Sequence, residues 1–112
     1  MDLQTLQESV DKWITTTGVR YFDIKTNTIL LAEEVGEFSR LIARIHGEQS
    51  FKIPITEAEG KEKLQDEMAD ILWVLSCLAN QLDIDLTKAI EKNFDKKNTR
   101  DSTRHLNNEK LF

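Results

Sequence analysis

The sequence predicts an all-α fold, with residues 1–112 forming one domain of four helices. Apolar residues recur at alternating intervals of three and four positions along most of the chain, which is the spacing of one face of an α-helix. A single proline and four glycines leave long stretches without a residue that breaks helices. Because 112 residues suit one domain, we expect a single core rather than two linked units.

The first two helices are predicted on either side of a short linker. Apolar residues at three-four-three spacing over 3–13 predict the first helix, which Gly18 is expected to end. The second helix is expected from about residue 22 or 24 to about residue 46, with Gly47 as its stop. Gly36 inside this helix costs about 1 kcal/mol relative to alanine. Either close helix packing or room for a ligand beside Glu37 would explain it.

The third helix is predicted to begin at Thr56-Glu57-Ala58-Glu59, which has the form of a capping box. Residues 48–55, with the only proline, form the loop before it. Asp83 or Asp85 can cap the fourth helix. The polar tail 101–112 is expected to be loosely ordered or to contact another subunit. The predicted core faces of the second and third helices are Leu31, Val35, Phe38, Ile42 and Ile45, and Leu64, Met68, Ile71, Leu75, Leu78 and Leu82.

Composition excludes several classes of protein. The 15 basic and 20 acidic residues give a net charge of −5, which argues against binding to nucleic acid or to an anionic membrane. No apolar run approaches the roughly 20 residues of a membrane span, and the N-terminus lacks the pattern of a signal peptide. The single cysteine, Cys77, lies among apolar residues and is expected to be a buried thiol in a cytoplasmic protein.

Two acidic groups stand within the apolar helical patterns. Residues three or four apart share a helix face, which brings together Glu34 with Glu37, and Glu67 with Asp70. Glu33 also shares a face with Glu37. If the second and third helices form an antiparallel hairpin, both pairs lie about ten residues, or roughly 15 Å, from the connecting loop. We therefore expect the two pairs to face each other.

Facing carboxylates need compensation, because partly buried negative charges repel one another. Oxygen ligands favour Mg²⁺, Mn²⁺ or Ca²⁺, and a magnesium site of this kind indicates attack of water on a phosphate chain. A di-iron bundle would include Glu-x-x-His on two helices, and neither His46 nor His105 has that spacing. The alternative is a pair of charged helix faces that carry no metal.

The acidic residues resemble a family signature. Glu33-Glu34-x-x-Glu37 followed by Glu67-x-x-Asp70 is similar to the E-E-x-x-E … E-x-x-D pattern of MazG-like nucleotide pyrophosphohydrolases. These belong to the all-α NTP pyrophosphatase superfamily, with the all-α dUTPases and phosphoribosyl-ATP pyrophosphohydrolase as relatives. The resemblance covers roughly residues 18–100 and implies a MazG-like four-helix bundle, completed by association into a homodimer or a dimer of dimers (homotetramer). Apolar faces left uncovered by four helices favour the same association.

The resemblance also implies an activity. A MazG-like enzyme hydrolyses a nucleoside triphosphate to the monophosphate and pyrophosphate with Mg²⁺, for which Mn²⁺ can substitute. Carried over by position, the metal ligands would be Glu34, Glu37, Glu67 and Asp70. Glu33 would be a further ligand, a group that orients water or a general base. The implied function is house-cleaning or control of a nucleotide pool. Alternatives are a sister enzyme acting on dUTP, dUDP or phosphoribosyl-ATP, and a non-catalytic helical module that binds nucleotide or a partner protein.

A basic stripe follows on the fourth helix. Lys88, Lys92, Lys96 and Arg100 recur every four residues, and Asn93 lies on the adjacent stripe. Taken alone, such a stripe is a solvated helix face. Beside a phosphate site, and because family members carry comparable residues there, we expect Lys92, Asn93, Lys96 and Arg100 to contact the triphosphate.

Aromatic residues could contact the base of the nucleotide. Trp73 lies three residues after Asp70 and could stack on it, and Tyr21 and Phe22 are further possibilities. For each of the three, a place in the core is the alternative that we favour.

Overall fold

The computed structural model describes residues 1–112 and contains helices but no strand. The prediction of an all-α chain with four main helices is confirmed. None of the helices combines the length and the apolar composition that a membrane crossing requires. The main helices are α1 (Leu3–Thr16), α2 (Ile24–Ile45), α3 (Glu57–Gln81) and α4 (Leu86–Lys96), followed by the short segments η1 (Lys97–Asp101), α5 (Ser102–Leu106) and η2 (Glu109–Leu111).

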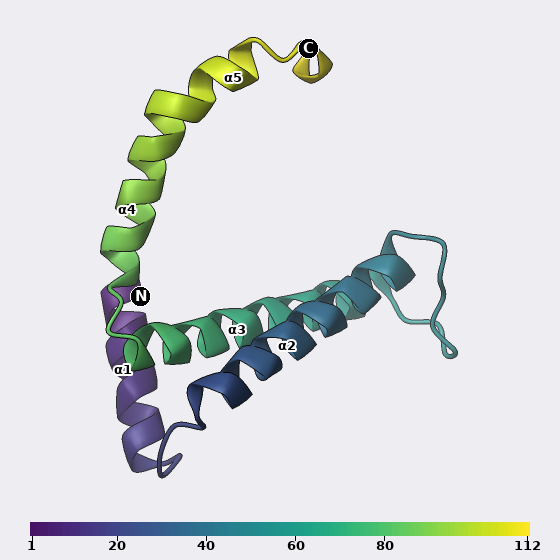
Figure 1. The fold of residues 1–112 in the computed structure, drawn as a ribbon. Coiled ribbons are helices and arrows are strands. Elements are labelled where there is room, and N and C mark those ends of the chain that lie inside the picture. Colours follow the sequence, from purple (N-terminus) through teal and green to yellow (C-terminus); the bar gives the residue numbers. More distant parts are fainter.

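Helices α2 and α3 form a long antiparallel hairpin, with loop 46–56 at its far end (Figure 1). Near the loop, a Cβ on Gly60 would lie 3.3 Å from Cδ1 of Ile45, so the helices are in close contact there. At the opposite end, Nδ2 of Asn27 donates to Oε1 of Gln81 at 2.8 Å. The predicted hairpin is therefore present along its whole length.

Each main helix begins at a side chain that accepts a hydrogen bond from the backbone N–H three residues later. Asp85, and not Asp83, caps α4, while Asp83 has a backbone φ of 56°. These caps satisfy amide groups that have no partner inside the helix. Asp2, Asp23 and Thr56 cap the other three helices.

Helix α1 packs on α3 and on the start of α4, where polar side chains hold the three helices together. Asn80 donates through Nδ2 to the carbonyl oxygen of Gln7 at 2.9 Å and to the hydroxyl oxygen of Tyr21 at 3.1 Å. Oε1 of Gln7 accepts from the N–H of Leu86 at 2.9 Å. We call Gln7, Tyr21, Asn80 and Leu86 the junction, because they fix the point at which α4 leaves the hairpin.

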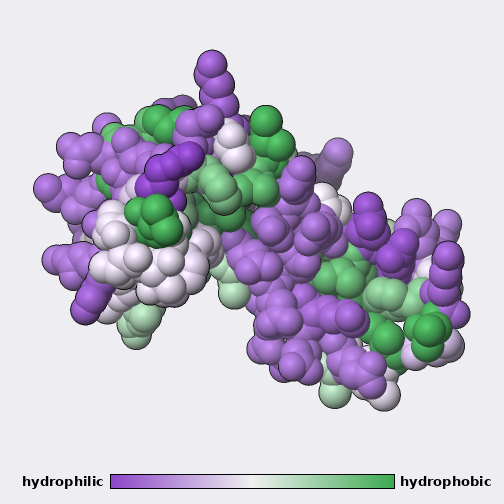
Figure 2. Space-filling view, turned by 90° about the horizontal axis from the view of Figure 1, so that it is seen from below, coloured by the Kyte–Doolittle hydropathy of each residue, from purple (hydrophilic) through white to green (hydrophobic).

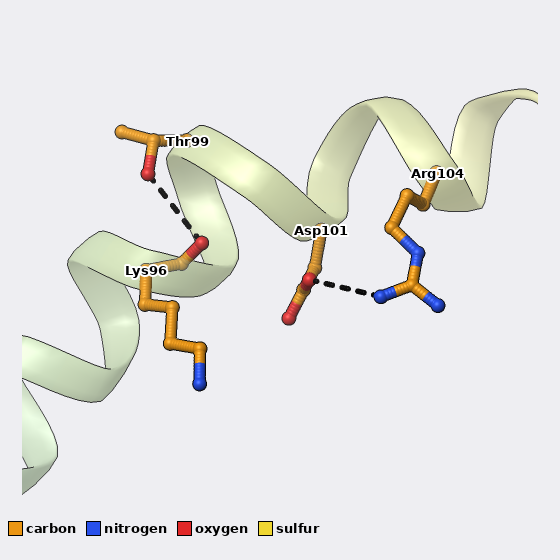
Figure 3. Close-up of polar contacts among 4 residues, drawn as sticks. All are labelled: Lys96, Thr99, Asp101 and Arg104. Carbon is orange, nitrogen blue, oxygen red and sulfur yellow. Dashed lines mark hydrogen bonds and ion pairs between the residues drawn. The ribbon is translucent and has the colours of Figure 1, made fainter.

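Residues 86–112, the arm, extend away from the hairpin in Figure 1. One chain therefore supplies the four helices, but its fourth helix does not lie alongside α2 and α3. The structure has helix α5 in the tail after Asp101, which was expected to be loosely ordered or to contact another subunit. The chain's one ion pair, between Asp101 and Arg104 at 3.6 Å, spans the start of α5, and the hydroxyl of Thr99 before it donates to the carbonyl oxygen of Lys96 (Figure 3).

Few residues are enclosed: 8 of 112 are buried, and apolar patches reach the surface in Figure 2. The expected core face of α3 is wrong in part, since Met68 is 54% and Leu75 39% exposed. The buried positions Val74 and Cys77 instead continue the line of the α3 carboxylates. In the hairpin, the inner face of α3 is thus shifted by one residue from the predicted face. Cys77 is the buried thiol expected.

Candidate active site

Three carboxylates meet in the middle of the hairpin. Oxygen atoms of Glu34 on α2 and of Glu67 and Asp70 on α3 all lie within 4.8 Å of one another. Because α2 and α3 run antiparallel, residues at similar distances from the loop come to the same level. The expectation that the two acidic groups face each other is confirmed for these three side chains.

Two oxygens of this group lack partners. Oε2 of Glu34 and Oε2 of Glu67 are buried, and no hydrogen-bond donor of the protein reaches either. The neighbouring carboxyl of Glu34, with which a proton can be shared, acts together with burial and with Glu37 to raise the pKa of Glu67 to about 7. A cation could replace that proton, so the three carboxylates form a candidate divalent metal site.

The other two predicted acidic residues lie at the edge of this group. Glu37 is exposed but close enough to Glu67 to raise its pKa. Glu33 is exposed and outside the set of mutually close oxygens. Each residue turns about 100° around a helix axis, so Glu33 points to a different side from Glu34.

Gly36 of α2 faces open space. A Cβ built on Gly36 would meet no atom within 4 Å. Close packing within the chain, one of the two explanations of this glycine, is therefore wrong. The other explanation, room for a ligand beside Glu37, stays a prediction.

The arm gathers the predicted triphosphate contacts at a distance from the carboxylates. Lys92, Asn93, Lys96 and Arg100 line one hollow of about 480 Å³, which we call the arm hollow. The arm and the middle of the hairpin are well separated in Figure 1. A single chain therefore brings these residues to one another but not to the acidic site.

The aromatic candidates occupy different surroundings. Trp73 is 36% exposed and meets Trp13 edge to face, with ring centroids 5.4 Å apart. Gly18 permits this arrangement, because a Cβ there would lie 2.9 Å from the Trp13 ring. Tyr21 donates its hydroxyl to Oδ1 of Asp11 at 2.7 Å in the junction, and Phe22 is exposed before α2.

A second hollow, of about 460 Å³, borders the carboxylates and was not foreseen from the sequence. We call it the hairpin hollow. The signal was present: Arg40 is three residues after Glu37 and Lys63 four before Glu67, so each shares a helix face with an acidic residue. Its charged lining consists of Arg40, Arg44 and Lys63 with Glu37, Asp66 and Glu67, and Phe51 of the loop borders it.

Known proteins share the segment that contains the acidic hairpin. The sequence family of the MazG nucleotide pyrophosphohydrolase domain matches residues 22–105, which include all five predicted acidic residues. The chain belongs to the MazG family. This MazG-family chain is 35% identical over 102 residues to the uncharacterized protein YpjD of Bacillus subtilis (strain 168), covering 91% of its own length and 88% of YpjD. It is also 32% identical over 73 residues to the Gene 37 protein of Mycobacterium phage L5, covering 65% and 61% of the two chains.

Solved structures share the fold of this MazG-family chain. The crystal structure of Bacillus subtilis YpjD superposes with a TM-score of 0.74 and 33% identity, covering 89% of this chain and 96% of that one. A Bacillus-conserved MazG protein, a nucleotide pyrophosphohydrolase, gives a TM-score of 0.73 and 30% identity over 89% and 93% of the two chains. The predicted MazG-like fold is thus confirmed.

Proposed function

We propose that this chain is a Mg²⁺-dependent nucleoside triphosphate pyrophosphohydrolase, which converts an NTP or dNTP and water to the monophosphate and pyrophosphate. The observation that carries the proposal is the meeting of Glu34, Glu67 and Asp70 across the hairpin, within a MazG nucleotide pyrophosphohydrolase domain. The proposed role is the removal of unwanted nucleotides from the cellular pool.

Glu34, Glu37, Glu67 and Asp70 would hold the Mg²⁺, and Mn²⁺ would suit the same oxygens. The residues fit a divalent cation because two of their buried oxygens have no donor in the protein. A cation bound there would neutralise phosphate charge and make water more acidic. The proton shared with Glu34, burial and repulsion among the carboxylates raise the pKa of Glu67, and such a cation would take the place of that proton.

We assign two further roles to residues beside the metal ligands. Glu33, exposed and outside the metal group, accepts the proton of the water that attacks the α-phosphorus. Trp73, one helical turn beyond Asp70, stacks on the base with its exposed part. Replacement of Glu33 by glutamine then lowers kcat while Mg²⁺ binding persists.

We also propose that two copies associate. The chain exposes 9042 Å², and its surface exceeds the roughly 6300 Å² expected for a compact chain of this mass by about 2700 Å². Permanent dimers bury areas of that order. Apolar residues that a second copy would cover lie on α3 (Met68, Leu72 and Leu75) and on α4 (Ile90 and Phe94). Sedimentation of the intact protein, against a Leu72→Glu variant, tests the association.

The triphosphate contacts on the arm stay a prediction. Lys92, Asn93, Lys96 and Arg100 can meet a substrate at the carboxylates only if the arm of one copy reaches the hairpin of another, because one chain keeps them apart. Dimer formation and arm contacts are therefore linked.

The test of the reaction is pyrophosphate release from a panel of ordinary and modified NTPs and dNTPs, with Mg²⁺ and with EDTA. We expect release from at least one nucleotide, abolished by EDTA. Activity confined to dUTP, dUDP or phosphoribosyl-ATP would replace the proposal by a sister enzyme. Folded protein that binds metal and turns over none of these nucleotides would favour a binding module.

A further inference from the structure

The hairpin hollow continues directly from the carboxylates toward the loop. It contains Glu37 and Glu67, so it shares walls with the acidic site. At 1.5 Å per residue, Arg40 lies about 4.5 Å and Arg44 about 10.5 Å beyond Glu37 along α2. Lys63 occupies the facing part of α3, one turn beyond Glu67 in the same direction. Negative side chains thus give way to positive ones along the hairpin.

The cations of this hollow form no ion pair and donate no side-chain hydrogen bond within the protein. Three carboxylates line the same space, yet the one ion pair of the chain within 4.0 Å is far away, in the arm. Arg40, Arg44 and Lys63 also donate no side-chain hydrogen bond to another protein atom within 3.5 Å. Side-chain bonds of arginine in this protein are confined to Arg20. The donors of these cations therefore remain available to an anionic ligand.

Arg44 is nevertheless held in position. Its guanidinium lies over the ring of Phe51, 5.7 Å from the ring centroid, and both residues are half-buried. A cation over an aromatic face keeps its N–H groups at the ring edge free to bind anions. Phe51 belongs to loop 46–56, so this contact joins the loop to the wall of the hollow.

We propose that Arg40, Arg44 and Lys63 form a phosphate subsite that binds the two outer phosphates of a nucleoside triphosphate in the same chain. The inference rests on the proposed function, because the α-phosphate must lie at the carboxylates for the outer phosphates to reach this hollow. It also gives the substrate a direction: the outer phosphates point toward loop 46–56, and the nucleoside points toward Trp73 at the other side of Asp70.

The subsite has a chemical task in hydrolysis. Water adds its oxygen to the α-phosphorus, and the bond from that phosphorus to the oxygen shared with the β-phosphate breaks. The electron pair of this bond leaves with pyrophosphate, whose negative charge rises. Guanidinium and ammonium groups already in place stabilise that charge without rearranging solvent.

The decisive measurement is the binding of inorganic tripolyphosphate to the intact protein with Mg²⁺ present, by titration calorimetry. Arg40→Ala and Lys63→Ala are each expected to weaken binding on the order of ten- to a hundredfold, the usual cost of losing a charge-assisted hydrogen bond. Lys61→Ala is the matched control, because Lys61 lies on the same helix but points to another side. Its binding should stay within about twofold of the wild type. Arg40→Lys, which keeps the charge, should recover part of the loss.

The outcomes separate this subsite from the proposed reaction. Loss of binding in Lys92→Ala and Lys96→Ala, with none in the Arg40 and Lys63 variants, would place the subsite on the arm and overturn the proposal. Failure of folded wild-type protein to bind tripolyphosphate would overturn it as well, even where nucleotides are hydrolysed. If tripolyphosphate binds through these cations and no nucleotide is hydrolysed, the subsite stands and the proposed reaction fails.

Discussion

The hairpin and the arm each present cations around a hollow of nearly the same volume, about 460 and 480 Å³. In the hairpin, two paired helices bring those cations next to three facing carboxylates. The arm carries its cations on a single exposed helical rod that meets the rest of the chain through α1. Similar charge therefore has different surroundings in the two regions, because only in the hairpin do the cations share a hollow with a member of the facing carboxylates, Glu67.

The difference shows which kind of pattern a linear sequence reveals. The arm stripe is conspicuous because its members follow one another every four residues on one helix. The hairpin cations are inconspicuous because Arg40 and Lys63 belong to different helices. Pairing of the helices, and not spacing along either of them, makes them neighbours.

Substitution of Glu67 is expected to have the largest effect on the hairpin. Glu67→Gln removes a charged member of the facing carboxylates, and we expect pyrophosphate release to fall about 10²- to 10³-fold, as for loss of other preorganised charged groups. Steady-state pyrophosphate release measures the effect, with Glu62→Gln on the same helix as control. Wild-type turnover in Glu67→Gln would show that the hairpin is not the catalytic region.

The next largest effect is the dependence of thermal stability on pH, which the carboxylates of the metal-free hairpin should cause. The pKa of Glu67 is raised to about 7 in the folded protein, from an ordinary value of 4.5. The folded state thus binds this proton more tightly than the unfolded state, which stabilises the fold fully below about pH 4.5. That stabilisation is lost as pH rises through about 7. Thermal unfolding in EDTA should show a falling Tm between pH 5 and pH 8, and a flatter profile for Glu67→Gln. Equal slopes for the two proteins would contradict the assignment.

A substitution in the junction should loosen the arm without opening the hairpin. Asn80→Ala removes the partner of Gln7 and Tyr21 in a partly buried site, which should cost about 1–3 kcal/mol of unfolding free energy. Hydrogen exchange should then speed up in α4 while the middle of α2 keeps its protection. Asn98→Ala, at an exposed arm position without a side-chain hydrogen bond, serves as control. Uniform acceleration throughout the chain would contradict a local junction.

Substitution of Gly36 should give the smallest change in the free energy of unfolding. Because a Cβ there would meet nothing within 4 Å, Gly36→Ala should stabilise α2 by about 0.5–1 kcal/mol. Gly60→Ala is the contrasting variant, since its Cβ would crowd Ile45 at 3.3 Å. Urea unfolding gives both values. A Gly36→Ala protein that is more stable but less active would indicate that the open space receives the substrate.

Much of the fold was predicted from local features of the sequence. Thr56 and Asp85 cap their helices because side-chain capping depends on a few adjacent residues. The facing of Glu34 with Glu67 and Asp70 followed from equal distances to the loop, which an antiparallel hairpin converts into contact.

Features that depend on helix pairing or on register did not follow from the sequence. Met68 and Leu75 satisfy the periodicity of a core face, but periodicity does not say whether the same chain covers that face. The departure of the arm depends on Gln7 and Asn80, which are 73 residues apart and carry no pattern that links them. The role of Arg40 needed the pairing of α2 with α3.

The junction also determines the order in which the molecule can assemble during synthesis. Gln7 emerges from the ribosome early, but its amide oxygen caps α4 through Leu86, 79 residues later. The α2–α3 hairpin joins segments separated by a short loop, so it can close as soon as α3 is made. Helix α1 must wait for Asn80 and Leu86 before its polar contacts exist. The nascent chain therefore completes its acidic centre first and acquires the anchor of its arm last.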